Sequence, residues 1–133
     1  MGILANSIHT GLFVGDIEKM VAYYRNILGL ESDYTGGPFA SFAINDGGLF
    51  MFDRKIFAKD MNMEYRPPRG INQTMEVCIG VPEKEDVDRE YKRITALGIS
   101  PLTGEPVTQP WGQRNFWLAD PEGNLIEIAS MMA

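Results

Sequence analysis

The stretch PWGQRNFWLADPEGNLIEIAS, Pro110–Ser130, indicates the kind of fold. It contains two apolar runs, Asn115–Ala119 and Leu125–Ala129, joined by the segment Asp120–Asn124. Pro121 restricts its own φ and biases the residue before it away from helix, while glycine and asparagine in the joining segment tolerate positive φ. Two strand-like runs around such a segment predict a β-hairpin.

Glu127 is the unusual residue of the second run. Side chains alternate across a strand, so Ile126 and Ile128 point to one face while Leu125, Glu127 and Ala129 point to the other. A carboxylate in mid-strand between two isoleucines is either a residue of an exposed face or a ligand-binding group on the floor of a sheet. A third alternative is a buried carboxylate that is hydrogen-bonded or pairs with Arg114.

Working outward from the hairpin, the chain contains one pattern twice. A strand over Ile3–Val14 precedes an amphipathic helix that begins after Asp16, a good N-cap, and stops at Gly29. A strand over Met75–Val81 precedes a second amphipathic helix, Lys84–Leu97, which stops at Gly98. Strand-like pieces follow the first helix at 31–34, 39–45 and 49–52, with a turn at Asp46-Gly47-Gly48. Residues 55–72 have no clear period and predict a long loop.

Superposing the two patterns matches His9 with Glu76 and Met51 with Glu127. One face of the predicted strands is apolar and suits a covering helix. The opposite face carries small or ionisable side chains, which leave space above a sheet: His9, Gly11, Glu76, Cys78, Gly80, Glu127 and Ala129. A curved sheet lined in this way is a cup for a small molecule.

Bulk composition narrows the class of protein. With 133 residues, 44% hydrophobic and 23% charged, the chain is expected to form one soluble domain. We expect one repeat unit at about 3–54, the loop at 55–72, and a second unit at about 73–131. A net charge of −6 without a basic patch argues against nucleic acid, and no apolar run approaches a membrane span. The single cysteine, Cys78, and the lack of a signal-peptide pattern favour a cytoplasmic protein.

Three segments carry a resemblance to a known family. They are His9–Asp16 (HTGLFVGD), Tyr24–Leu30 (YRNILGL) and Asp120–Glu127 (DPEGNLIE). Over essentially its whole length the chain resembles the vicinal oxygen chelate superfamily, which includes glyoxalase, bleomycin-resistance and extradiol dioxygenase proteins. The segment from Pro110–Arg114 through Asp120-Pro121 is especially similar to bleomycin-resistance and uncharacterised glyoxalase-like members. The resemblance implies an α+β fold of two paired βαβββ units that form a curved mixed sheet cup, with helices on its outer face. It also implies a homodimer.

The resemblance further implies a place for a metal. Metal-using members hold the ion at four positions, typically with His, Glu or Gln, His and Glu. His9 and Glu127 match the first and last positions, whereas Met51 and Glu76 replace the other two. A thioether is a poor ligand beside hard oxygen atoms. His9, Glu76 and Glu127 remain as a candidate metal set, and the cofactor is either absent or a divalent Mn, Fe, Ni or Zn ion.

Other side chains are candidate ligand contacts. His9, Met51, Cys78 and Arg114 would line the cup. Aromatic residues would supply stacking walls, or else core packing: Phe39, Phe42, Trp111 and Trp117. Glu76 and Glu127, brought together without a metal, would repel, so one would tend to keep a proton. The pair would then serve as a general base or recognise a cationic ligand.

Two functions follow from these residues. The favoured one is a metal-independent small-molecule-binding protein of the glyoxalase/bleomycin-resistance type. The alternative is a divalent-metal lyase, isomerase or dioxygenase in which Glu127 and Glu76 are catalytic.

Overall fold

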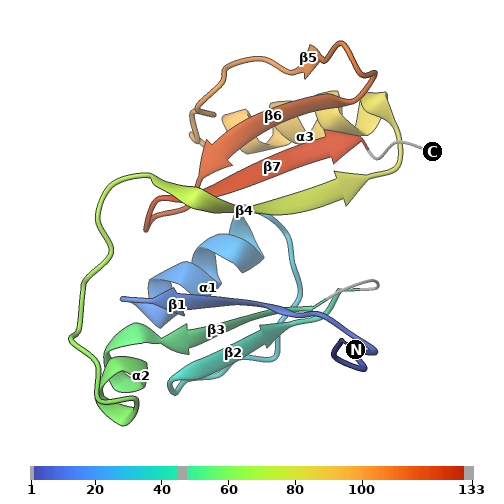
Figure 1. Ribbon diagram of the computed structural model, residues 1–133. Coiled ribbons are helices and arrows are strands. Elements are labelled where there is room, and N and C mark those ends of the chain that lie inside the picture. The colour runs from blue at the N-terminus through green and yellow to red at the C-terminus, as the bar shows by residue number, and fades with distance from the viewer. Residues whose placement is uncertain (1, 45–47, 131–133) are drawn as a thin grey trace. The chain divides into compact units, whose positions relative to one another are not determined.

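The computed structural model describes residues 2–44 and 48–130, and the chain divides into two compact units (Figure 1). Unit 1 is Met1–Pro68 and unit 2 is Arg69–Ala133. Each unit combines at least one helix with one mixed sheet, so the expected α+β class is confirmed. Asp46 and Gly47 of the predicted turn lie outside the described residues.

Unit 1 is built on a sheet of order β1-β3-β2. Its elements are β1 (Thr10–Val14), α1 (Ile17–Asn26), β2 (Phe39–Phe42), β3 (Leu49–Asp53) and α2 (Arg54–Asp60). β1 runs parallel to β3, and β2 runs antiparallel to it. The strand expected at 31–34 is reduced to a single antiparallel bridge between Glu31 and Ala43. The predicted first strand is also shorter, since it begins at Thr10.

Helix α1 begins as predicted, because the Asp16 carboxylate accepts a hydrogen bond from the Lys19 amide at 3.1 Å. Its apolar side chains are buried against one face of the sheet. That face supplies Val14, Ala40, Phe42, Leu49 and Met51. The opposite face is aromatic. There the ring of Phe50 lies over Gly11, where an added Cβ would come within 2.4 Å of it.

Helix α2 corrects the expected loop over 55–72. Asp53 ends β3 and caps α2, because its carboxylate accepts a hydrogen bond from the Ile56 amide at 2.9 Å. The helix has only 7 residues, which is too short for an apolar period to emerge from the sequence. Phe57 of α2 packs against Phe13 of β1, with ring centroids 4.2 Å apart.

Unit 2 has a sheet of order β4-β7-β6-β5 and one helix. Its elements are β4 (Asn72–Val81), α3 (Lys84–Ala96), β5 (Val107–Thr108), β6 (Arg114–Ala119) and β7 (Asn124–Ser130). β6 and β7 form the predicted antiparallel hairpin. Its turn is closed by Asp120, whose carboxylate accepts hydrogen bonds from the amides of Glu122 and Asn124, both at 3.0 Å.

Helix α3 covers one face of the unit 2 sheet (Figure 1). Val87 and Ile94 of the helix are fully buried, and Tyr91 meets Phe116 edge to face with centroids 5.5 Å apart. Ile126 and Ile128 lie on this covered face, as predicted. Alternation therefore sends the side chains between them to the other face, which α3 does not cover and which is called here the open face of unit 2. No helix in the described ranges, 2–44 and 48–130, could span a membrane.

Candidate functional site

Two carboxylates and a thiol converge on the open face of unit 2. Glu76 and Cys78 come from β4 and Glu127 comes from its neighbour β7, where the parallel register places Cys78 directly beside Glu127. One carboxylate oxygen of each glutamate and the Cys78 sulfur lie within 4.8 Å of one another. These three residues are called the acidic cluster. Residue spacing alone put them on one face, and strand pairing brings them together.

A chain of amide hydrogen bonds holds Glu127 in place. Asn115 of β6 donates from Nδ2 to Glu127 Oε2 at 2.9 Å. Gln109 in turn donates from Nε2 to Asn115 Oδ1 at 2.9 Å, which sets the orientation of the Asn115 amide. Because Asn115 and Glu127 are only 2% and 7% exposed, the carboxylate is held in a fixed position.

Glu76 is positioned from a third strand. The indole Nε1 of Trp117 donates to Glu76 Oε1 at 3.0 Å. Trp117 is also the register partner of Glu127 across β6 and β7. The indole therefore lies beside both carboxylates and offers them a flat apolar neighbour.

The acidic cluster lacks a positively charged partner among the residues that the structure describes. Within the described ranges, neither Glu76 nor Glu127 forms an ion pair with Lys, Arg or His. Burial raises the pKa of Glu127, and the neighbouring Glu76 raises it further, whereas the hydrogen bond from Asn115 opposes the shift. Burial and the two carboxylates raise the pKa of Cys78 to about 11.

These pKa shifts limit the chemistry of the site. With so high a pKa, Cys78 is a protonated thiol at neutral pH and a weak nucleophile. Two carboxylates on a partly desolvated sheet face attract a cation, because a positive charge would relieve their mutual repulsion. The arrangement is suited to binding a cationic group or a metal ion, or to holding and accepting a proton.

The predicted equivalence of Met51 and Glu127 is displaced by one residue. Val14 pairs with Asp53 in unit 1 and Val81 pairs with Ser130 in unit 2, so Phe50 is the residue that corresponds to Glu127 when His9 is matched with Glu76. Met51 is 0% exposed and lies on the face that α1 covers. Its sulfur is part of the core of unit 1.

The predicted aromatic contacts fall into different environments. Phe39 is 49% exposed on the aromatic face of unit 1, stacked with Phe50 at 5.7 Å. Phe42 packs on the covered face, 5.7 Å from the ring of Tyr24, so it does not share a wall with Phe39. Trp111 lies 56% exposed in the turn before β6 and donates to Gln113. The contact roles of Phe39, Trp111 and Trp117 stay predictions.

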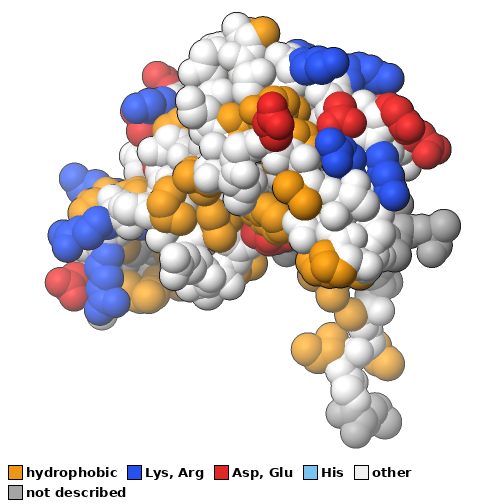
Figure 2. All heavy atoms as spheres, turned by 90° about the horizontal axis from the view of Figure 1, so that it is seen from above, with side chains coloured by type: hydrophobic (Ala, Val, Ile, Leu, Met, Phe, Trp, Pro, Cys, Tyr) orange, Lys and Arg blue, Asp and Glu red, His pale blue; other side chains and the backbone are white. Residues whose placement is uncertain are grey.

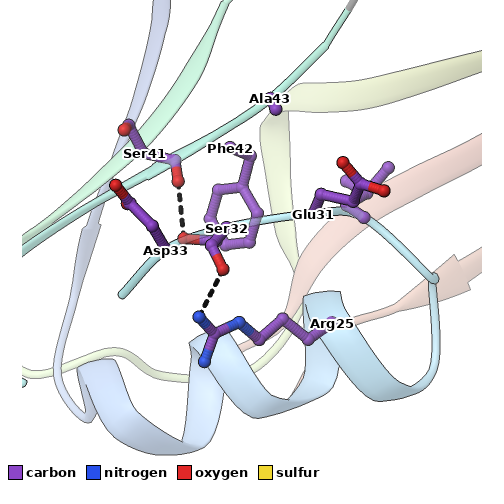
Figure 3. Close-up of a pocket in the computed structure, with 8 residues that line it drawn as sticks. Arg25, Glu31, Ser32, Asp33, Ser41, Phe42 and Ala43 are labelled. Carbon is purple, nitrogen blue, oxygen red and sulfur yellow. Dashed lines mark hydrogen bonds between the residues drawn. The ribbon is translucent and has the colours of Figure 1, made fainter. Parts of the chain in front are cut away.

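Phe42 instead borders a shallow hollow in unit 1 of about 620 Å³ (Figure 3). Arg25 of α1 points into it, but the guanidinium donates to the backbone carbonyls of Ser32 and Tyr34. Its role is to hold the segment 31–34 against the end of α1. Among the described residues that line the hollow, the basic one, Arg25, is therefore engaged by backbone carbonyls.

Arg114 does not pair with Glu127, which corrects one of the alternatives above. It lies on the covered face of β6, where Nε and Nη2 both donate to the carboxylate of Asp88 on α3, the shortest contact being 2.8 Å. Alternation sends Arg114 and Asn115 to opposite faces, and the amide rather than the guanidinium reaches Glu127.

His9 belongs to unit 1, just before β1. Its Nε2 shares a 3.0 Å hydrogen bond with Ser7 Oγ, and its ring lies against Gly48. Its partnership with Glu76 and Glu127 stays a prediction. The sequence reading missed Asn115 and Gln109 as supporting residues. The sequence does hold a signal for Asn115, because it is a polar residue in an apolar strand. By alternation it lies on the same face of that strand as Trp117.

Comparison with known proteins agrees with this fold. Residues 7–128 match the family model of the Glyoxalase/Bleomycin resistance protein/Dioxygenase superfamily. A bleomycin resistance protein of Geobacillus stearothermophilus is 27% identical, over 86% of this chain and 89% of the relative. Metallothiol transferase FosB of Lysinibacillus sphaericus is 28% identical, over 92% of this chain and 80% of the relative.

A solved structure gives the same result for the fold. The crystal structure of a glyoxalase/bleomycin resistance protein/dioxygenase from Nocardioides matches with a TM-score of 0.80 at 22% identity, covering 98% of this chain and 87% of that one. With the family model matching nearly the whole chain, the protein belongs to the glyoxalase/bleomycin resistance protein/dioxygenase superfamily.

Proposed function

We propose that the protein binds a small molecule that carries a cationic group, and that the acidic cluster on the open face of unit 2 receives this group. One observation carries the proposal. Glu76 and Glu127 lie close together on a sheet face without a basic partner in the described ranges. A cationic group would supply the missing positive charge.

The neighbouring residues support a flat ligand. The Trp117 indole lies beside the carboxylates and is bonded to Glu76. Aromatic faces attract cations and stack on planar rings, so indole and carboxylates together suit a planar aromatic cation. The similarity to a bleomycin resistance protein supports a drug-binding role. Within this proposal Glu127 and Glu76 are ligand contacts, and the function needs no metal.

A matched pair of probes tests the role of charge. N-methylquinolinium and quinoline have nearly the same shape and differ in positive charge. In titration calorimetry at pH 8, where Glu127 is more fully ionised, we expect saturable binding of N-methylquinolinium and at least tenfold weaker binding of quinoline. Bleomycin is a second probe, chosen because the chain is similar to a bleomycin resistance protein.

The double variant E76Q/E127Q removes both negative charges at nearly constant shape. It should weaken binding of N-methylquinolinium at least tenfold. E85Q, on the exposed N-terminal turn of α3, changes net charge outside the cluster and should leave the affinity unchanged. Equal affinity for both probes, or for wild type and the double variant, would refute the proposal.

A divalent metal ion is the second candidate, favoured by the distance among the ligand atoms of the acidic cluster. Glu76 and Glu127 offer hard oxygen ligands that suit Mn or Fe(II), while a thiolate and carboxylates together suit Zn. His9 would be the additional ligand. A bound ion would act as a Lewis acid, and the similarity to a metallothiol transferase supports this candidate.

Elemental analysis separates the two candidates. Purified protein is dialysed separately against Mn, Fe(II), Ni and Zn, then against buffer, and its metal content is measured. About one ion per chain, absent from E76Q/E127Q and retained by E85Q, would favour the metal. An H9A variant then tests His9 as a ligand. The expected homodimer is a separate prediction, which light scattering after size-exclusion chromatography can check.

A further inference from the structure

A second hollow lies in unit 1, between α2 and the segment that follows it. After α2 the chain reverses at Asn62, whose φ of 55° lies in the left-handed region. The Met63 amide then donates to the Ala58 carbonyl at 2.7 Å, which closes the reversal. The segment 63–66 thus returns alongside the helix it has just left.

Arg54 holds this returning segment in place. Its Nη1 donates to the Arg66 carbonyl at 2.9 Å, and its Nε donates to the Phe13 carbonyl of β1 at 3.0 Å. One guanidinium therefore joins the sheet, the start of α2 and the returning chain. The space left between helix and segment is a cavity of about 380 Å³. It is lined by Lys55, Ile56, Ala58, Lys59, Met63 and Tyr65.

The walls of this cavity are apolar and uncovered. Ile56 is 41% exposed, Met63 is 60% exposed and Tyr65 is 37% exposed. Three large apolar side chains grouped around one hollow differ from apolar residues scattered singly over a surface, and together they offer an apolar wall to a ligand. The volume falls within the range of about 300–1,000 Å³ that small-molecule sites occupy.

Two ammonium groups border the apolar walls. Lys55 and Lys59 lie one helical turn apart on α2, and Lys55 Nζ lies 6.0 Å from the centre of the Tyr65 ring. Neither lysine forms an ion pair with any residue that the structure describes. Figure 2 shows Lys and Arg side chains, together with acidic ones, beside hydrophobic side chains at its left margin, the side where Figure 1 draws α2 and the chain that follows it. This basic rim occurs on a chain whose net charge is −6.

We propose that this hollow binds a small amphipathic monocarboxylate. Its apolar tail lies against Ile56, Ala58, Met63 and Tyr65, and its carboxylate lies between Lys55 and Lys59. Two cations beside an apolar wall complement a ligand with one anionic end and an apolar body. This site is separate from the acidic cluster and takes a ligand of opposite charge, so it stands independently of the function proposed above.

Octanoate is the probe for this site, with octylamine as a control of equal chain length and opposite charge. In titration calorimetry at low ionic strength, we expect saturable binding of octanoate, weakened by added salt, and at least tenfold weaker binding of octylamine. The methyl resonance of Met63, assigned with an M63L variant, should shift on addition of octanoate.

Charge-removing variants complete the test. K55Q/K59Q should weaken octanoate binding at least fivefold. Y65S should also weaken octanoate binding, because it removes part of the apolar wall against which the tail lies. K92Q on α3 is the control and should bind like wild type, as should E76Q/E127Q. No saturable binding of octanoate, equal binding of octylamine, or an unchanged affinity in K55Q/K59Q would overturn the proposal. Loss of binding in E76Q/E127Q would also overturn it, because the carboxylate would then depend on the other site.

Discussion

Replacing Asn115 by alanine removes a side-chain amide that donates to the buried carboxylate of Glu127. The bond measures 2.9 Å between Asn115 Nδ2 and Glu127 Oε2, and both residues are buried. A hydrogen bond to a charged group contributes about 1.5–3 kcal/mol to stability, against about 0.5–1.5 kcal/mol for a bond between neutral groups. Gln109 loses its acceptor as well, but it is half-buried and water can replace that partner.

We therefore expect N115A to lower the free energy of unfolding by about 1.5–3 kcal/mol at pH 8. For a chain of this size the melting temperature should fall by roughly 5–15 °C. In the E127Q background the same substitution breaks only a neutral hydrogen bond, so its cost should be about 0.5–1.5 kcal/mol. The difference between the two backgrounds, about 1 kcal/mol, measures the part of the bond that depends on the charge of Glu127.

Urea unfolding followed by circular dichroism at pH 8 and pH 5 measures these costs. The cost of N115A in the wild-type background should decrease at pH 5, because protonation of Glu127 turns the charged acceptor into a neutral one. N124A is a control of the same chemistry, since it removes an amide that bonds Asp120 in the hairpin turn. A cost for N115A that is the same in both backgrounds and at both pH values would refute the reasoning.

Four further outcomes follow from the structure. E127Q should be more stable than wild type at pH 8 in the absence of ligand, because the pKa of Glu127 is raised above its ordinary 4.5 in the folded protein. The folded state then binds the proton of Glu127 more tightly than the unfolded state does, so the stability of the wild type rises as the pH falls. In thermal melts, the higher stability of E127Q should therefore disappear near pH 4. F116A should lower the free energy of unfolding by about 3–5 kcal/mol in urea, since Phe116 is fully buried under α3. W117F changes the next residue, which lies on the open face, and should lower the free energy of unfolding by less than about 1.5 kcal/mol. W117F should still weaken N-methylquinolinium binding in calorimetry, and a large loss of stability in W117F would contradict the assignment of faces. G123A should lower the melting temperature, because Gly123 has a φ of 83° and an added Cβ would lie 1.7 Å from the Gly70 carbonyl; a wild-type melting temperature would contradict this turn geometry.

Local patterns in the sequence were sufficient for several parts of this protein. The cap at Asp16, the period of the two long helices and the turn chemistry of 120–124 act over a few residues, and each was confirmed. Alternation along a strand is equally local. It placed Glu76 and Cys78 on one face of β4, and it placed Glu127 away from the isoleucines that α3 covers.

Other features depended on which strands pair and in which register. Superposing the two sequence patterns matches Met51 with Glu127, but the parallel pairing of β1 with β3 makes Phe50 the equivalent residue. Arg114 and Asn115 are adjacent in sequence, yet they lie on opposite faces of β6. Arg114 therefore donates to Asp88 of α3, whereas Asn115 donates to Glu127 of β7. Pairing register and helix docking join residues far apart in the chain, so only the tertiary structure determined the partners of the acidic cluster.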